Sequence, residues 1–538
     1  TVRFFTNDDV SMTALASGSY AGTPGAHLVY VGFLPGLMLK WAYTAVPSIP
    51  WYTLMLYACG LAGVTAVTWV VWQARRWNAG RLLGPMIVIT VCWGFMLFVR
   101  PGFTIAAFAL GTAAICLLHA AARLEPTIAR RSGLAAAALF GAAAAIRWDS
   151  MIGTLAICLP MIAVGLTRVD RRLALRIVGL AVAVVAVVSV CNFVADRPTD
   201  WAHYADFNSA REELHATQRL GAVLASPDDP DVQAMLTAND WTINDVFIFN
   251  TFFLEDPAYY DTEKVERLVA VSERPQFASG WSDAWSDIVT GRSVLLLAVC
   301  LSAALVALRN RRVAAVALVQ LGWAGGACLY VSHAQRFPER IAFPIAIMLS
   351  LGLLTLGATT PAAPLGSRSW QRSRDVATWV LAGSFVLTAA LPMLRNYSPI
   401  TLSSGNDARV DRLVDQLRTL DEIDPEGRFV AVASAVDFAG ANAFSVDPLF
   451  EDGRILWSSW NSQSPAQLRR LQRMGLTQDL LRSLLDQPHR YLVVRDTRAL
   501  RFQRAYTERL GVRAEFVPLG SLGGATVYAI RTRERANG

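Results

Sequence analysis

The sequence predicts a polytopic α-helical membrane protein that carries an α/β domain outside the membrane at its C-terminal end. Of its 538 residues, 54% are hydrophobic and only 17% are charged, and the mean hydropathy is +0.36. These values are typical of a chain that lives in lipid and exclude an ordinary soluble enzyme. Long apolar runs recur up to about residue 395, and beyond it the chain becomes polar and alternates helix-like and strand-like segments.

The apolar runs are long enough to cross a bilayer, at roughly 15 to 22 residues with few or no charges. They number ten, and the shorter ones are the weakest candidates. We expect spans at Trp51 to Trp72, Leu82 to Val99, Gly102 to Ala122, Gly133 to Ile146, Met151 to Leu166, Ala174 to Ala195, Val294 to Leu308, Val313 to Val331, Ile341 to Leu356 and Val376 to Leu394.

The arginines between these spans predict the orientation. Five connections carry three basic residues each, and the short connections that alternate with them carry four in total. The first set is Arg75, Arg76, Arg81; Arg123, Arg130, Arg131; Arg168, Arg171, Arg172; Arg309, Arg311, Arg312; and Arg368, Arg372, Arg374. The excess places these five connections in the cytoplasm and the remaining loops outside.

This orientation divides the chain into five parts. They are an outer acidic loop with interfacial helices (1–50), six spans (51–195), a large outer loop (196–292), four spans (293–395) and an outer soluble α/β domain (396–538). The apolar run from His27 to Ala45 is assigned to the outer interface, because a full span there would invert every later loop. An ordinary transmembrane helix is the alternative.

Two further expectations concern the origin and the start of the chain. The chain opens outside with Thr1 and an acidic motif, which predicts that a first helix, running from the cytoplasm, is missing from this sequence. Its basic residues are almost all arginine, and alanine and valine are plentiful. This usage points to a high-GC genome, such as that of an actinobacterium.

The C-terminal part has the pattern of a small α/β domain. Helices are expected at Ala408 to Leu420 and Pro465 to Leu485, and strands at Arg428 to Ala433, Tyr491 to Arg495, Val512 to Pro518 and Ala525 to Arg531. In the large outer loop, the spacing of Val265, Leu268 and Val269 predicts amphipathic helices on the membrane face.

Two adjacent carboxylates, Asp8 and Asp9, follow Asn7 at the head of the chain. A carboxylate within hydrogen-bond reach can take the proton from an attacking acceptor hydroxyl, which is worth about 10² to 10⁴ in rate. The second can bind hydroxyl groups of a substrate, as can Asn7, or the pair can hold a divalent cation (Mg²⁺, Mn²⁺ or Ca²⁺). The alternative is that both merely cap a helix beginning near Val10.

With this motif, the order of segments resembles the GT-C glycosyltransferases, membrane enzymes that take sugars from polyprenyl-phosphate carriers. The residues that carry the resemblance are Asn7-Asp8-Asp9, and the rest is architecture: interfacial helices, a large outer loop and an outer C-terminal domain. In that family the outer loop after the first helix carries a catalytic acidic motif, and the loop between helices seven and eight helps to close the active site. The resemblance therefore implies catalytic roles for Asp8 and Asp9.

Outward-facing arginines are candidates for the carrier phosphate, because a planar guanidinium grips a phosphate well in a partly dry site. Arg336 and Arg340 lie in SHAQRFPER at the head of a span, with His333 close by as a substrate-binding residue. Arg147 lies in RWDS, where Asp149 interrupts an apolar hairpin. Arg147 and Asp149 can equally form a structural ion pair.

Arg211 and His215 are four residues apart in the large outer loop and would share one helix face. Both are candidate substrate-binding residues, and His215 is also a candidate for proton transfer. A surface histidine that has no function is the alternative.

The expected function is an inverting glycosyltransferase that moves a sugar from a polyprenyl-phosphate carrier to a hydroxyl acceptor, a cell-envelope glycan or lipid, outside the plasma membrane. Its expected partners are membrane lipid, the lipid-linked donor and the acceptor, and no nucleic acid. A flippase or transporter of lipid-linked sugars is the alternative, but it would keep ionisable residues near the bilayer midplane, where the predicted spans have few. A sensor built on the C-terminal domain would not need ten spans.

Overall fold

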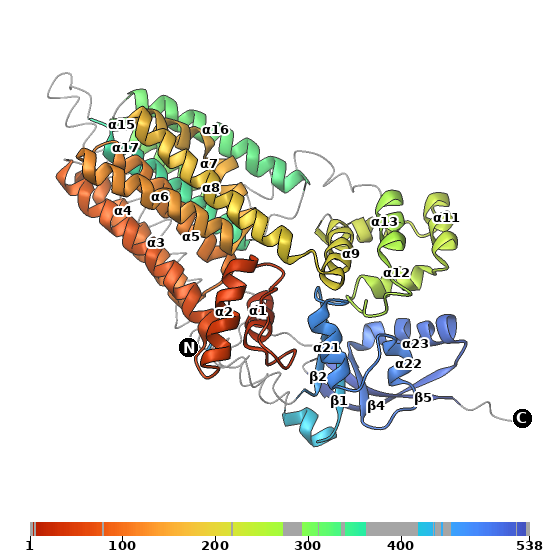
Figure 1. Cartoon of the computed structure of the whole chain (residues 1–538). Helices are drawn as coiled ribbons and strands as arrows, with labels where there is room; N and C mark the ends of the chain where they lie inside the picture. The colour runs from red at the N-terminus through yellow and green to blue at the C-terminus, as the bar shows by residue number, and fades with distance from the viewer. Residues whose placement is uncertain are drawn as a thin grey trace, which may run out of the picture.

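The computed structural model shows a helix bundle, a group of helices at one end of the bundle and a C-terminal sheet domain at that same end (Figure 1). The structure describes residues 4, 7–77, 80–216, 219–272, 293–309, 311–334, 339–361, 418–433, 435, 443–444, 453–522 and 524–533. The predicted span at Val376 to Leu394 and most of the predicted helix at Ala408 to Leu420 lie outside these residues.

The bundle consists of long apolar helices. They are α3 (Trp51–Arg76), α4 (Gly80–Val99), α5 (Phe103–Ala121), α6 (Pro126–Ile146), α7 (Trp148–Arg168), α8 (Arg171–Ala195), α15 (Ser293–Arg309), α16 (Arg311–Ala334) and α17 (Glu339–Thr359). Within the described residues, seven of them are long and apolar enough to cross a membrane, namely α3, α4, α5, α7, α8, α16 and α17. Helices α6 and α15 also form where the sequence predicts spans, and α15 has 17 residues.

The bundle has an inner and an outer layer. Helix α5 is buried along its whole length and packs against α3, α6, α7 and α17. Helix α8 lies outside, with Leu175, Val182 and Phe193 left 65%, 61% and 61% exposed. Because apolar side chains at this exposure need an apolar solvent, this face of α8 fits contact with lipid tails.

The two ends of the bundle differ. At one end, the Nε of Arg123 donates a hydrogen bond to the carbonyl of Thr359, so the loop after α5 meets the end of α17. At the other end, the hydroxyl of Thr53, near the start of α3, donates to the carbonyl of Ala443 in the C-terminal part. The described connections that carry three arginines each therefore lie at the end opposite the sheet domain.

Short helices gather at the end that carries the sheet domain (Figure 1). Near the N-terminus these are α1 (Asn7–Ser17) and α2 (Phe33–Ala45). After α8 come α9 (Thr199–Ala216), α10 (Arg219–Ala225), α11 (Pro230–Asn239), α12 (Ile243–Phe249) and α13 (Thr262–Val271), which share a hydrophobic core of their own. Helix α2 has 13 residues, about 20 Å, which is less than the roughly 30 Å of a bilayer core.

The C-terminal domain is a five-stranded mixed sheet in the order β2-β1-β3-β5-β4. Strands β1 (Arg428–Val432), β2 (Ile455–Ser458) and β3 (Arg490–Val494) are parallel, and β4 (Ala514–Leu522) and β5 (Ala525–Thr532) complete it antiparallel. Its helices are α21 (Pro465–Arg473), α22 (Leu480–Leu484) and α23 (Asp496–Leu510).

The structure corrects two details of the predicted domain. The single helix expected at Pro465 to Leu485 is two helices, because the chain turns at Gly475, whose φ of 62° is in the left-handed region that suits glycine. Strand β2 and helix α23 were not predicted. Strand β2 is short and fully buried, so it has no alternating pattern.

Polar contacts join the sheet domain to the short helices. The hydroxyl of Tyr20, after α1, donates to Oε1 of Gln467 on α21 at 2.5 Å. The buried carboxylate of Glu255, after α12, accepts hydrogen bonds from Ser458 and Ser462 at 2.9 and 3.0 Å. Arg509 on α23 pairs with Asp245 on α12 at 2.7 Å. These contacts hold three parts of the chain together at one end of the bundle.

Candidate active site

Helix α1 begins at Asn7, so Asp8 and Asp9 lie in its first turn, where the helix dipole favours negative charge. Asp9 is 1% exposed. Its Oδ1 accepts one hydrogen bond from the hydroxyl of Tyr52 and another from the backbone N–H of Phe103, both at 3.0 Å. Phe103 is the first residue of α5, so Asp9 caps the N-terminus of α5, and it ties α1 to α3 and α5.

The two neighbouring carboxylates therefore have different surroundings. Asp8 is half-buried, and its charge acts on the hydroxyl of Tyr30. The pKa of Tyr30 is raised to about 12, mainly by burial; the charges of Asp8 and Glu212 act in the same direction, and Arg211 opposes them by its charge and by a hydrogen bond. The Tyr30 hydroxyl consequently stays protonated at neutral pH. The charges of Asp8 on α1 and of Arg211 on α9 both act on this hydroxyl.

Arg147 lies beside the same tyrosine. Its guanidinium is 4.8 Å from the ring centroid of Phe103 and 5.9 Å from that of Tyr30, and these two rings are parallel with centroids 6.0 Å apart. Its Nη1 donates to the hydroxyl of Thr104 at 2.6 Å. Asp149 is exposed in the first turn of α7 and forms no ion pair with Arg147 among the residues that the structure describes. The structural ion pair considered for Arg147 and Asp149 is thus absent.

Arg211 is only 2% exposed. Its Nη2 donates to Oδ1 of Asn208 at 2.5 Å, and its guanidinium lies 5.4 Å from the ring centroid of Phe252. Its Nε has no hydrogen-bond partner, and within the described part of the chain Arg211 forms no ion pair. A buried guanidinium that lacks a carboxylate partner is costly, so Arg211 is suited to bind an anionic ligand.

His215 lies one helical turn after Arg211 and is partly buried. Its Nδ1 is 3.0 Å from the carbonyl of Arg211, and its ring is 4.2 Å from that of Phe252 between centroids. Burial and then the charge of Arg211 lower the pKa of His215 to about 3. The imidazole is therefore neutral at physiological pH, and its position favours packing over proton transfer.

The C-terminal domain completes the site through Trp460. The ring of Trp460 packs edge-on against Tyr30 at 4.8 Å between centroids, and its carbonyl accepts a hydrogen bond from the hydroxyl of Tyr204 on α9 at 3.0 Å. Neither Tyr30 nor Trp460 was predicted. The run WSSWNSQS is polar in sequence yet buried from Trp457 to Ser464, and this burial is visible only in the structure.

Other predicted residues cannot be placed at the level of side chains. Arg336 lies outside the described residues. His333 lies near the end of α16, Arg340 near the start of α17, and Asn7 at the start of α1. Because α17 ends beside Arg123, its start lies about 30 Å away, at the end of the bundle that carries α1. The phosphate contacts expected of Arg336 and Arg340 stay predictions.

No family model matches this sequence, and no curated protein matches it. The chain is similar to two solved structures of ArnT from Cupriavidus metallidurans, one in the apo state and one bound to undecaprenyl phosphate. Both are 13% identical to it, and in both cases the match covers 98% of this chain and 94% of the other; the TM-scores are 0.39 and 0.36. At this level the likeness carries no argument about activity, which rests on the residues of this chain.

Proposed function

We propose that this protein is an inverting glycosyltransferase that moves a sugar from a polyprenyl-phosphate carrier to a hydroxyl acceptor on the outer face of the membrane. One observation carries the proposal: the buried Arg211, which has no ion pair in the described structure, acts with the half-buried Asp8 on one tyrosine, Tyr30. A cation for a leaving phosphate and a carboxylate for an attacking hydroxyl thus meet at one end of a lipid-facing bundle.

The distribution of charged loops supports the proposed side of the membrane. The described connections with three arginines each lie at the end opposite Asp8, Tyr30 and Arg211. Because positively charged loops are retained in the cytoplasm, that opposite end is assigned to the cytoplasm and the candidate site to the outside. The carrier lipid would reach the site from the outer leaflet.

The proposed transfer forms one bond and breaks one. The acceptor oxygen bonds to the anomeric carbon as its proton passes to the Asp8 carboxylate, while the bond from that carbon to the carrier phosphate breaks. The phosphate oxygen takes the bonding pair and is held by the Nε–H of Arg211 and the guanidinium of Arg147. Attack opposite the leaving phosphate inverts the configuration. The neutral Tyr30 hydroxyl can donate a hydrogen bond to the sugar or the phosphate.

Asp9 is assigned a positioning role. Its Oδ1 already accepts two hydrogen bonds, from Tyr52 and from Phe103, which fits a cap and not a base. The same contacts make it a poor ligand for a divalent cation. In the part of the chain that the structure describes, no three His, Cys, Asp or Glu side chains gather as a metal site. Asp8 would be the carboxylate that holds a cation, should one bind with the carrier phosphate.

Replacing Asp8 with Asn tests the proposal most directly. We expect the full chain in nanodiscs to transfer sugar from polyprenyl-phosphate donors, tested as a panel, to cell-envelope glycan acceptors. Asp8→Asn should lower the rate about 10² to 10⁴-fold, because it removes the base while leaving the phosphate contacts. Undecaprenyl phosphate, titrated in native mass spectrometry, should still bind.

Asp206→Asn is the matched control, since Asp206 is exposed on α9 near Arg211. It should keep wild-type transfer. Near-normal transfer by Asp8→Asn would contradict the base role. Movement of lipid-linked sugar across a vesicle membrane, with no new glycosidic bond formed, would favour the transporter instead.

A further inference from the structure

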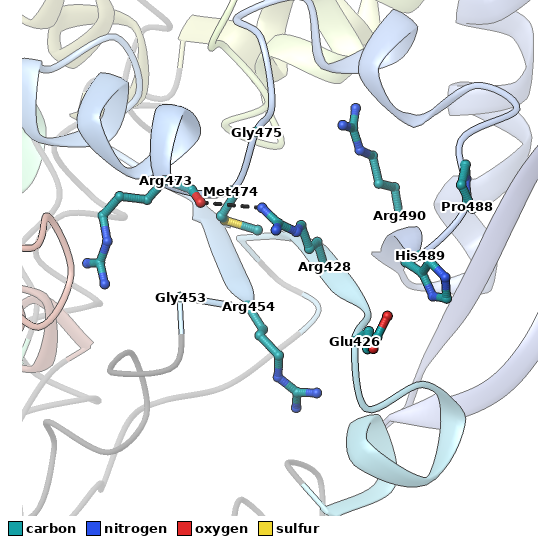
Figure 2. Close-up of a pocket in the computed structure, with 10 residues that line it drawn as sticks. All are labelled: Glu426, Arg428, Gly453, Arg454, Arg473, Met474, Gly475, Pro488, His489 and Arg490. Carbon is teal, nitrogen blue, oxygen red and sulfur yellow. Dashed lines mark hydrogen bonds between the residues drawn. The ribbon is translucent and has the colours of Figure 1, made fainter.

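The C-terminal domain has a basic pocket that the transfer reaction does not use. Its volume is about 570 Å³, within the range of small-molecule sites. Figure 2 shows its lining, which comes from the starts of strands and from the turns beside them: Glu426, Arg428, Gly453, Arg454, Arg473, Met474, Gly475, Pro488, His489 and Arg490. Four of these ten residues are arginines and one is acidic.

The sheet register brings three of these arginines into one row. In the parallel sheet Arg428 is paired with Arg490, and the amide of Phe429 donates to the carbonyl of Arg454 at 2.7 Å on the other side. Like charges on neighbouring strands are destabilising, so the row lowers the stability of the empty domain. A bound anion would offset this repulsion.

Two guanidiniums of this row converge on one point. The Nη1 of Arg428 and the Nη2 of Arg490 lie 3.6 and 3.9 Å from the position that a Cβ on Gly475 would occupy. Gly475 has no side chain and a φ of 62°, so the turn after α21 leaves this point open. The convergence gives two forked donors on one side of the pocket.

Three arginines that line the pocket, Arg428, Arg490 and Arg473, donate to backbone carbonyls. Arg428 donates to the carbonyl of Arg473 at 3.3 Å, and Arg490 to the carbonyl of Ser483 at 3.1 Å. Arg473 donates to the carbonyls of Ser19 and Tyr20 at 3.4 and 3.3 Å. Within the described residues none of these three arginines has an ion pair.

Among the described residues that line the pocket, the remaining charges leave an excess of positive charge. Arg454 is the exception to the unpaired arginines, because it forms an ion pair with Asp421. The imidazole of His489 is 2.7 Å from a carboxylate oxygen of Asp424. Glu426 is exposed and is the acidic residue among those that line the pocket. A surface patch of solvated arginines would need neither a concave shape nor the alignment of three strands.

We propose that this pocket binds a phosphate group, held by the guanidiniums of Arg428 and Arg490, with space beside it for the group that the phosphate carries. Guanidinium forks match the oxygens of a phosphate in two-pronged contacts. The phosphate can belong to a lipid headgroup or to a soluble phosphorylated compound, and its chemistry is the same in both. The site is separate from the Asp8 and Arg211 site and does not depend on the proposed transfer reaction.

Binding of inorganic pyrophosphate to the full chain in phosphatidylcholine nanodiscs, measured by isothermal titration calorimetry, tests the proposal. We expect saturable binding that Arg428→Gln and Arg490→Gln each weaken about tenfold, the loss of one charge-assisted contact. Arg504→Gln is the matched control, because Arg504 is exposed on α23 away from the pocket. It should bind as the wild type does.

A variant that binds pyrophosphate more tightly than the wild type provides a test that misfolding cannot explain. Glu426→Gln removes the acidic rim residue and should strengthen pyrophosphate binding a few-fold, with an unchanged melting temperature. Nanodiscs made of equal parts phosphatidylcholine and phosphatidylglycerol distinguish the sources. Competition by the anionic lipid in the wild type, lost in Arg428→Gln, supports the site with a headgroup as its ligand; no competition supports it with a soluble phosphate. Absent binding, or an equal loss in Arg504→Gln, would overturn the proposal.

Discussion

The end of the bundle and the pocket at the starts of β1 and β3 both contain arginines that we propose bind an anion, but the surroundings of these arginines differ. Arg211 is a single guanidinium, 2% exposed, set between aromatic rings and an asparagine. Arg428 and Arg490 are partly exposed, lie side by side and donate to backbone carbonyls. The first site has one buried guanidinium, and the second has several that are partly exposed to solvent.

The difference teaches what each site can contribute. A charge in a low-dielectric setting interacts strongly and is little screened by salt, whereas exposed charges are weak singly and are screened. The buried site is therefore suited to stabilise charge that develops during a reaction, and the open pocket to hold a ligand reversibly.

Removing the buried charge should have the largest effect. Arg211→Gln should weaken binding of undecaprenyl phosphate about 100-fold, because a buried charge contact is lost. The loss should be nearly the same at low and high salt. Arg197→Gln, an exposed arginine at the same end of the bundle, serves as the control. A deficit that disappears at high salt would show that Arg211 is solvated and would end the contrast between the two sites.

The cap on α5 should come next in size. Asp9→Ala leaves the Tyr52 hydroxyl and the Phe103 N–H buried without an acceptor, which costs about 1–3 kcal/mol. Thermal denaturation in detergent should show a clear drop in melting temperature. Asp8→Ala, at the half-buried neighbour, should lower it less. Equal drops would mean that the two carboxylates share one structural role.

Acid should lower the folding stability of the protein, because His215 is held neutral in the folded state. Its folded-state pKa of about 3 is below the ordinary value of 6.5, so the unfolded chain binds the proton more readily between these pH values. Stability from this group is complete above about pH 6.5 and is lost as the pH falls toward 3, by about 1 kcal/mol per unit. His215→Gln should flatten this part of the curve of melting temperature against pH. An unchanged slope would place the titration elsewhere.

Raising the salt concentration should have the smallest effect on binding, mainly at the basic pocket of the C-terminal domain. Raising the ionic strength from 0.05 to 0.5 M should weaken pyrophosphate binding by roughly a few-fold, because the Debye length falls well below 10 Å. Carrier binding at Arg211 should change much less. The two titrations on one preparation are the direct comparison.

The candidate site was predictable where charge interrupts an apolar pattern. Asp8 and Arg147 stand out beside hydrophobic runs, whereas Arg211 is indicated by its spacing of four residues from His215; the structure brings all three near Tyr30. Tyr30 and Trp460 gave no such signal, because aromatic residues are common at membrane interfaces for reasons unrelated to function. The sequence also could not separate Asp8 from Asp9, since their roles depend on how α1 faces the start of α5.

The fold followed a similar rule. Helices of the bundle are local and periodic, so most predicted spans coincide with helices of the structure. The row formed by Arg428 and Arg490 depends on the pairing of strands far apart in sequence, which no local pattern records. The prediction of a single helix at Pro465 to Leu485 was wrong for a local reason, because the chain turns at Gly475 and divides this segment into two helices.

The contact between Tyr20 and Gln467 spans 447 positions of the chain. At the usual speed of the ribosome, about 5 to 20 residues per second, roughly 20 to 90 s separate the synthesis of these two side chains. Through that interval helix α1 has been synthesised, whereas helix α21, which carries Gln467, has not. The order of synthesis thus delays this contact until most of the chain has been translated, and a product truncated before Gln467 lacks it.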